Sequence, residues 1–80
     1  MDIRKTMGEI LNRVLGYEEQ DLQEIWGNNL WEEDLIDSLG FVTLISQIEN
    51  AFSIQIDLRS LDPQSIASFA AIEALVAGKM

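Results

Sequence analysis

The sequence predicts a small all-α protein, a bundle of three to four helices with a long loop between the first and second main helices. Three stretches with apolar residues three or four positions apart predict the main helices. Eighty residues allow one domain, because a second folding unit would leave neither half enough chain to bury a core. We therefore expect residues 1–80 to form a single domain.

The first helix is expected after Asp2, whose carboxylate can cap it. Gly16 should end this helix, because glycine readily takes the left-handed conformation that follows many helices. The apolar residues between them recur with helical spacing and form one face of the helix: Ile3, Met7, Ile10, Leu11 and Val14.

The next segment, residues 17–37, is a long connection with apolar side chains of its own. Leu22 and Ile25 are three positions apart and predict a short helical turn over residues 18–25. Trp26 and Trp31 are expected to pack this loop against the core, because large aromatic side chains contribute much of the buried surface in small domains. An ordered loop of this length is uncommon in a small domain and is often functional.

The clearest helix begins at Asp37 or Ser38 and runs to about Phe52. Its core residues occupy a stripe about 100° wide and are Phe41, Leu44, Ile45, Ile48 and Phe52. Residues 53–57 should be extended and residues 58–62 should form one turn, which Pro63 should stop. A last helix is expected with Ser65 as its cap and Gly78 at its end. One side of it carries Ile66, Phe69, Ile72 and Val76.

The net charge is −9, and nearly all of it lies in one segment. Residues 17–37 hold eight acidic residues and no basic residue, a net charge of −8. Negative charge of this size argues against nucleic acid and anionic membranes as partners and favours partners with basic docking faces. The chain has no membrane-spanning apolar stretch and no basic-then-apolar leader, so we expect a cytoplasmic monomer without membrane insertion.

The chain contains no cysteine and no histidine. Their absence excludes a disulfide framework, the usual zinc or copper site, and a Ser/His/Asp or Cys/His nucleophile. The acidic segment also lacks the alternating oxygen ligands and central glycine of an EF-hand. We therefore expect no metal site and no catalytic residue, and the protein is not expected to be an enzyme.

Asp37, Ser38 and Leu39 stand where the acidic segment passes into the most amphipathic helix. A capping role alone would explain Asp37 or Ser38. Leu39 and Val42, however, lie outside the core stripe and flank the side on which Ser38 projects, which indicates a contact surface. Gly40 costs a helix about 1 kcal/mol relative to alanine, so helix stability does not explain it. A small residue there would let another group approach the backbone near Ser38.

These residues resemble the acyl carrier protein superfamily. The shared features are an Asp-Ser-Leu motif at the start of the second main helix, a Glu and a Phe near the end of that helix, and a short connector that contains isoleucine. The resemblance covers the whole chain in length and element order, and its specific part lies between residues 34 and 56. In this sequence the motif residues are Asp34, Leu35, Ile36, Asp37, Ser38, Leu39, Gly40, Val42, Leu44, Ile45, Ile48, Glu49, Phe52, Ile54 and Ile56.

The resemblance implies that Ser38 carries a covalent 4′-phosphopantetheine arm from coenzyme A, whose thiol holds an acyl or aminoacyl group as a thioester. It implies a carrier of lipid or secondary metabolite biosynthesis that performs no catalysis. Asp37 would help position the modifying transferase and its Mg²⁺, while Leu39, Val42 and Glu49 would contact partner enzymes. The implied partners are a phosphopantetheinyl transferase, an acyl- or aminoacyl-activating ligase, and acyl-transferring enzymes.

The sequence leaves the cargo open. The exposed side of the helix after Ser38 is neutral at Thr43, Ser46, Gln47 and Asn50, whereas carriers of bacterial fatty acid synthesis usually have several acids there. Residues 48–52 are similar to D-alanyl carriers of teichoic acid modification and to stand-alone aminoacyl or peptidyl carriers. Residues 57–64, in contrast, lack the tryptophan-containing stretch of D-alanyl carriers.

A second hypothesis needs no prosthetic group. In this alternative the protein is an unmodified acidic helical interaction module, and residues 17–37 dock a basic partner. Replacing Ser38 by alanine would then leave its activity intact, whereas reversing the charges at Glu32, Glu33 and Asp34 would abolish binding.

Overall fold

The computed structural model describes residues 2–80, apart from the side chain of residue 58. Its elements, in chain order, are α1 (Ile3–Leu15), α2 (Glu19–Ile25), α3 (Ser38–Phe52), the 3₁₀ turns η1 (Leu58–Ser60) and η2 (Pro63–Ile66), and α4 (Phe69–Lys79). The described residues contain no strand. The predicted all-α bundle with a long loop ahead of its second main helix is confirmed.

The local signals of α1 and α3 give the helix ends that were predicted. The Asp2 carboxylate accepts the Lys5 N–H at 3.1 Å, and Gly16 ends α1 with a φ of 78°. Asp37 caps α3, which runs to Phe52. The short helix predicted over residues 18–25 is α2, which begins after Glu18.

The start of α4 differs from the prediction. Ser68, not Ser65, caps this helix, and its hydroxyl accepts the Ala71 N–H at 3.1 Å. Ser65 lies in η2, which Pro63 begins, because the fixed φ of proline suits a first helical position. Gly78 lies within α4, which continues to Lys79. The predicted single turn is found as η1 (Leu58–Ser60).

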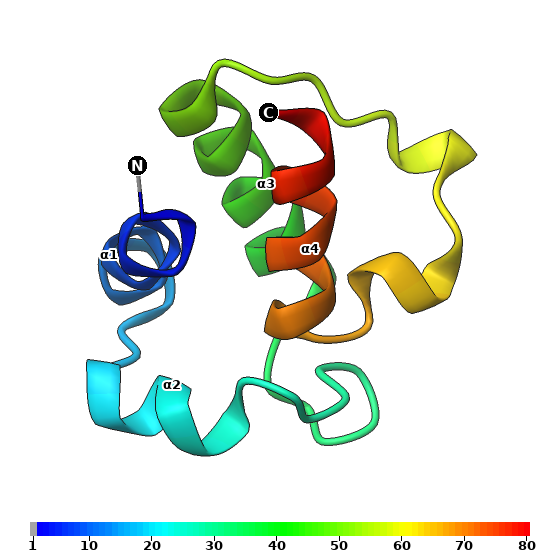
Figure 1. Ribbon diagram of the computed structural model, residues 1–80. Coiled ribbons are helices and arrows are strands. Elements are labelled where there is room, and N and C mark those ends of the chain that lie inside the picture. Colours follow the sequence, from blue (N-terminus) through cyan, green and yellow to red (C-terminus); the bar gives the residue numbers. More distant parts are fainter. Residues whose placement is uncertain (1) are drawn as a thin grey trace.

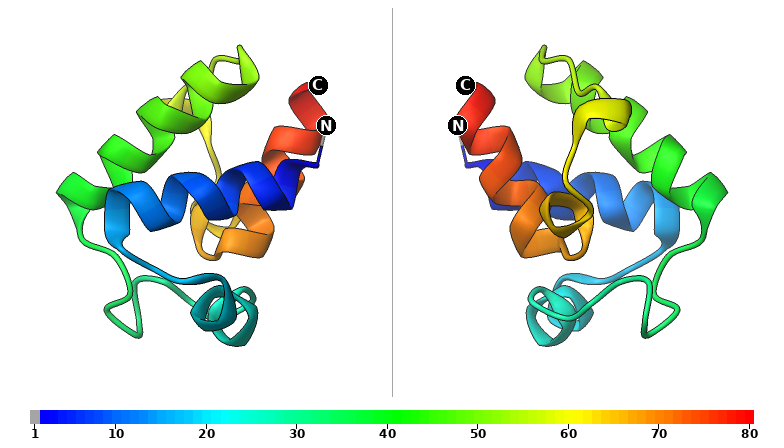
Figure 2. Two further views of the ribbon diagram at one scale, coloured as in Figure 1. Left: turned by 90° about the vertical axis from the view of Figure 1, so that its left-hand side faces the viewer. Right: turned by 90° about the vertical axis from the view of Figure 1, so that its right-hand side faces the viewer.

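The three longer helices enclose one hydrophobic core. In Figure 1, α1 is seen end-on beside α3 and α4, while α2 and the loop after it close the lower end of the bundle. The helix α1 packs on both α3 and α4, and its C-terminal end reaches the start of α3 (Figure 2). All five residues of the predicted α3 stripe are buried. The buried core residues are Met7, Ile10, Leu11, Leu22, Trp26, Leu30, Ile36, Phe41, Leu44, Ile45, Ile48, Phe52, Ile56, Phe69, Ile72 and Val76.

Backbone hydrogen bonds tie the long loop to the start of α4. The Leu30 N–H donates to the Ala67 carbonyl at 2.8 Å, and the Ala70 N–H donates to the Trp26 carbonyl at 2.9 Å. Trp26 is buried, as predicted for loop packing. Trp31 packs edge-on against Phe41, with ring centroids 5.2 Å apart, but keeps 38% of its surface exposed. The loop is therefore an ordered part of the bundle that leads the chain into α3.

Among residues 2–80, no helix has both the length and the apolar character needed to cross a membrane.

Candidate functional site

Ser38 is the first residue of α3, and its side chain is exposed. The residue before it, Asp37, is extended and holds the first turn at two points. Its carboxylate Oδ1 accepts the Gly40 N–H at 2.6 Å, and its carbonyl accepts the Phe41 N–H at 2.9 Å. The predicted serine is thus presented on a fixed helical turn.

The segment directly ahead of Ser38 is anchored to the bundle at two adjacent residues, Leu35 and Ile36. Ile36 is buried in the core, and the Leu35 carbonyl accepts a hydrogen bond from the Tyr17 hydroxyl. Between these anchors and the acidic loop, Asp34 adopts a left-handed conformation with a φ of 53°. The chain turns sharply at Asp34 and then enters α3 along a path set by Leu35 and Ile36.

The two apolar residues predicted to flank Ser38 are exposed. Leu39 keeps 76% and Val42 keeps 54% of its surface accessible, although both belong to the helix with the most buried face. Leu39 and Val42 are three positions apart, so they lie on the same side of α3. Their exposure is as predicted, and their contact with partner enzymes stays a prediction.

Glu49 has a structural contact that the sequence did not reveal. One of its carboxylate oxygens accepts the Ile56 N–H at 2.8 Å, and the side chain is partly buried. This bond ties the connector after α3 back to the helix, just after Ser53 has turned the chain with a φ of 54°. The predicted partner-binding role of Glu49 stays a prediction. Its hydrogen bond to the Ile56 N–H is a separate, structural role.

Gly40 has close neighbours from the protein itself. A Cβ atom at this position would lie 2.9 Å from Asp37 Oδ1 and 3.1 Å from Leu15 Cδ2. The sequence indicated that a small residue would let another group approach the backbone near Ser38. The groups that approach are the capping carboxylate and the last residue of α1.

The acidic segment leads up to this site. All eight of its carboxylates lie on exposed residues, and the two ion pairs that the described residues form, Arg4–Glu73 and Arg59–Asp57, lie elsewhere. The predicted excess of negative charge on the approach to Ser38 is therefore not neutralised by those pairs. Its acidic residues are Glu18, Glu19, Asp21, Glu24, Glu32, Glu33, Asp34 and Asp37.

A cluster that the sequence did not predict joins three helices. The Glu73 carboxylate of α4 accepts the Trp26 indole N–H at 3.0 Å and pairs with Arg4 of α1 at 3.1 Å. The Arg4 guanidinium lies over the Trp26 ring, 5.0 Å from its centroid. These residues are far apart in the sequence, so no local pattern could have indicated their contact.

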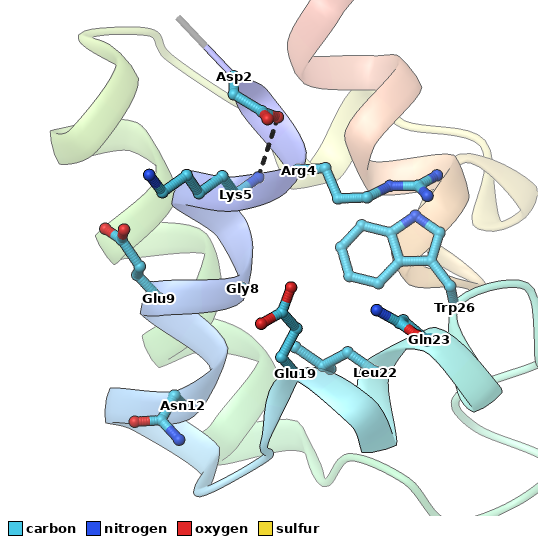
Figure 3. A pocket seen from close by; sticks show the side chains of 10 residues that line it. All are labelled: Asp2, Arg4, Lys5, Gly8, Glu9, Asn12, Glu19, Leu22, Gln23 and Trp26. Carbon is cyan, nitrogen blue, oxygen red and sulfur yellow. Dashed lines mark hydrogen bonds between the residues drawn. The ribbon is translucent and has the colours of Figure 1, made fainter.

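The cluster borders a groove of about 880 Å³ between α1 and α2. Figure 3 shows Arg4 above the indole of Trp26 at one end of the groove, with Asn12 at the other. No lining residue comes from residues 34–42. The groove is thus separate from the Ser38 site. A smaller hollow lies next to Ser38 and is lined by Leu15, Tyr17 and residues 34–37. Within residues 2–80, no group of three or more carboxylates is placed to hold a metal ion.

Comparison with known proteins identifies the family of the chain. The family described as "Phosphopantetheine attachment site" matches residues 5–72. Over 55 residues the chain is 33% identical to the D-alanyl carrier protein of Leuconostoc mesenteroides subsp. mesenteroides, an alignment that covers 69% of this chain and 67% of that protein.

The family match and the relative together define the class of this small helical bundle as a carrier protein. The chain belongs to the phosphopantetheine attachment site family, within the superfamily of acyl and peptidyl carrier proteins. Its prosthetic group is a covalently attached 4′-phosphopantetheine, and the protein is a carrier and not an enzyme. Carrier proteins are modified by phosphopantetheinyl transferases and interact with ligases and acyl-transferring enzymes.

Proposed function

We propose that Ser38 is the attachment point of the phosphopantetheine arm and that the protein presents a small aminoacyl or acyl group to partner enzymes. The observation that carries the proposal is the exposed Ser38 hydroxyl on the first turn of α3. In the modification, Ser38 Oγ forms a bond to phosphorus and the diphosphate P–O bond of coenzyme A breaks. Adenosine 3′,5′-bisphosphate leaves, and a base of the transferase takes the hydroxyl proton.

The first turn of α3 suits a phosphodiester on Ser38. The Phe41 N–H is the donor that reaches the Asp37 carbonyl, so the earlier N–H groups at Ser38 and Leu39 precede the intrahelical ladder. Such N–H groups, together with the helix dipole, favour a negative charge at this end of the helix. The charge of Asp37 is directed to the Gly40 N–H, which limits its repulsion of the phosphodiester. When bound, the arm supplies a thiol that holds the cargo as a thioester.

Two observations support a small cargo. The core residues of α3 and α4 are large and leave little surface exposed, since Leu44, Ile48, Phe69, Ile72 and Val76 are each fully buried. Protein interiors are close-packed, so a long acyl chain could enter only by displacing such residues. The relative described above is named a D-alanyl carrier protein. We therefore propose D-alanine or another small amino acid as the first cargo to test.

The attachment site can be tested by mass spectrometry. Incubating the unmodified chain with coenzyme A, Mg²⁺ and a broad-specificity phosphopantetheinyl transferase should add the mass of one phosphopantetheine. Ser38→Ala should gain no mass, whereas Ser46→Ala, at an exposed serine of the same helix, should be modified like the wild type. Modification of Ser38→Ala, or none of the wild type, would refute the proposal. The second result would favour the alternative hypothesis, in which the protein is an unmodified acidic interaction module.

The cargo can be tested on the modified protein. A D-alanine-activating ligase with ATP should add one alanyl group to the thiol, and the thioester should be cleaved by hydroxylamine. In parallel, the unmodified chain can be treated with octanoyl coenzyme A and the transferase, which moves the octanoyl-phosphopantetheine to Ser38 and releases adenosine 3′,5′-bisphosphate. We expect the octanoyl group to leave the melting temperature unchanged, because the chain stays outside the filled core. A clear rise in melting temperature with octanoyl cargo would instead indicate a chain inserted in the bundle.

A further inference from the structure

The Tyr17 hydroxyl joins two parts of the chain close to Ser38. It donates a hydrogen bond of 2.5 Å to the carbonyl of Leu35, which is 18 positions away in the sequence and stands just ahead of Ser38. Tyr17 follows the end of α1, the end that reaches the start of α3 (Figure 2). Within residues 2–80, this is the one hydrogen bond that joins residues 32–37 to a part of the chain outside their own loop and α3.

Tyr17 is itself held by two other elements. Its ring packs edge-on against Phe69 of α4, with ring centroids 6.2 Å apart, and Phe69 is fully buried. On its backbone side, Asn12 Nδ2 of α1 donates to the Tyr17 carbonyl at 3.0 Å. The position of the hydroxyl is therefore set by α1 and α4, independently of the loop that it binds.

The segment that accepts this bond has few other links to the bundle. Asp34 takes a left-handed conformation with a φ of 53°, which is unfavourable for an L-residue. The Leu35 N–H donates to the Leu30 carbonyl at 2.9 Å, a bond within the same loop. Ile36 is buried in the core. Besides the burial of Ile36, the Tyr17 hydroxyl is thus what ties the path into α3 to the rest of the protein.

We propose that Tyr17 is a positioning residue for the modification of Ser38, an inference that rests on the proposed function. Its hydroxyl fixes the Leu35 carbonyl, and with it the direction in which the chain enters α3 and presents the Ser38 hydroxyl to the transferase. The bond is only partly buried, so water can take the place of the lost hydroxyl in a variant. Loss of the hydroxyl should therefore free the segment ahead of Ser38 without unfolding the bundle.

The test measures the kinetics of modification in Tyr17→Phe, which keeps the ring on Phe69 and removes only the hydroxyl. The unmodified full chain, checked for folding by circular dichroism, is treated with coenzyme A, Mg²⁺ and a phosphopantetheinyl transferase. We expect kcat to fall by about five- to twentyfold, less than the roughly hundredfold loss that a 1 Å misplacement can cause. KM for the carrier should stay close to the wild-type value, because the surface that docks on the transferase is unchanged.

Ser68→Ala is the matched control for lost stability. It also removes one partly buried hydrogen bond of a hydroxyl group, in this case the cap at the start of α4. It should lower the melting temperature as Tyr17→Phe does but keep the wild-type kcat, because the variant is still folded at the assay temperature.

Amide hydrogen exchange, measured by nuclear magnetic resonance, shows where Tyr17→Phe changes the protein. Exchange should become faster at residues 35–40 than in Ser68→Ala. At the core amides of Ile10 and Ile48, in α1 and α3, it should change no more than in Ser68→Ala. This local signature distinguishes a positioning role from a general loss of stability.

Three results would overturn the inference. The first is a wild-type kcat in Tyr17→Phe, and the second is an equal fall in Ser68→Ala, which would show that the rate follows stability. The third is a fall in kcat without faster exchange at residues 35–40, since the hydroxyl would then not act by holding this segment. Failure of the wild type to be modified would instead refute the proposed function, so the two failures are distinguishable.

Discussion

Within residues 2–80, two residues other than glycine take left-handed conformations, Asp34 with a φ of 53° and Ser53 with a φ of 54°. They stand at the two ends of the segment that contains α3: Asp34 turns the acidic loop toward Ser38, and Ser53 ends the helix. An L-residue in this region costs roughly 1–2 kcal/mol, less for aspartate and asparagine, because Cβ approaches the carbonyl oxygen. The position and direction of α3 are therefore set partly by two unfavourable backbone conformations.

Replacing Asp34 by glycine should stabilise the protein. Glycine has no Cβ to oppose a φ of 53°, and this gain exceeds the greater entropy that glycine gives the unfolded chain. We expect the free energy of unfolding to rise by about 0.5–1 kcal/mol, measured from the midpoint of urea unfolding. Asp34→Asn is the control for the lost charge, since it keeps the Cβ atom. A glycine variant less stable than the asparagine variant would contradict the argument.

The long loop between α1 and α3 is held in place by contacts that α1 and α4 make with it. The Glu73 carboxylate joins α4 to Trp26 at the end of α2 and to Arg4 in α1. The same loop forms backbone bonds with residues just before and within α4, at Ala67 and Ala70. The segment that delivers Ser38 is thus fixed by α1, which precedes it, and by α4, which follows only after α3 in the chain.

Removing the Glu73 carboxylate should loosen this arrangement. Glu73→Ala leaves the Trp26 indole N–H, on a residue with 8% of its surface exposed, without its acceptor. A buried donor left unsatisfied costs about 1–3 kcal/mol, and we expect the free energy of unfolding to fall by that amount. Circular dichroism would follow the melt, and tryptophan fluorescence would report the change at Trp26.

The control for this loss is the other ion pair. Arg59→Ala removes a partner of Asp57 that is 94% exposed, and pairs of that kind contribute little to stability. Arg59→Ala should therefore melt like the wild type. Equal losses in the two variants would mean that the Glu73 cluster is no more than a surface contact.

Local signals explain which element ends could be predicted. Asp2, Gly16 and Asp37 act through bonds to residues within four positions, so their roles follow from neighbouring sequence. Ser65 and Ser68 have equal capping chemistry, and a tertiary contact decides between them. The Ala67 carbonyl is taken by the Leu30 N–H of the long loop, which leaves the Ala71 N–H to the Ser68 hydroxyl.

The site shows the same division between local and distant contacts. The exposure of Ser38, Leu39 and Val42 followed from the helical period alone. The sequence also showed that Gly40 required an explanation. A Cβ atom at position 40 would also lie 3.1 Å from Leu15 Cδ2, and this contact arises only because α1 packs against α3.

Across the whole molecule, charge and apolar surface are separated around Ser38. The eight exposed carboxylates lie before it, in the loop and α2, while the exposed side of α3 after it is apolar or neutral at Leu39, Val42 and Ser46. We therefore predict that long-range attraction of a partner and close contact with it use different parts of the surface. Charged groups at the edge of an interface act mainly on the rate of association, whereas close apolar contacts act on dissociation.

The acidic segment should guide the phosphopantetheinyl transferase, the partner that modifies the protein, toward its binding site. The association rate constant of the transferase with the wild type should fall as ionic strength rises, and steering of this kind can change such rates by about 10- to 1000-fold. The triple variant Glu32→Gln/Glu33→Gln/Asp34→Asn should associate more slowly at low salt and show a weaker salt dependence. Glu9→Gln, at an exposed acid of α1 outside the segment, should behave like the wild type. Leu39→Ala should raise the dissociation rate constant and leave the salt dependence unchanged. Stopped-flow fluorescence gives both constants, and an unchanged salt dependence in the triple variant would show that the acidic segment does not guide the partner to Ser38.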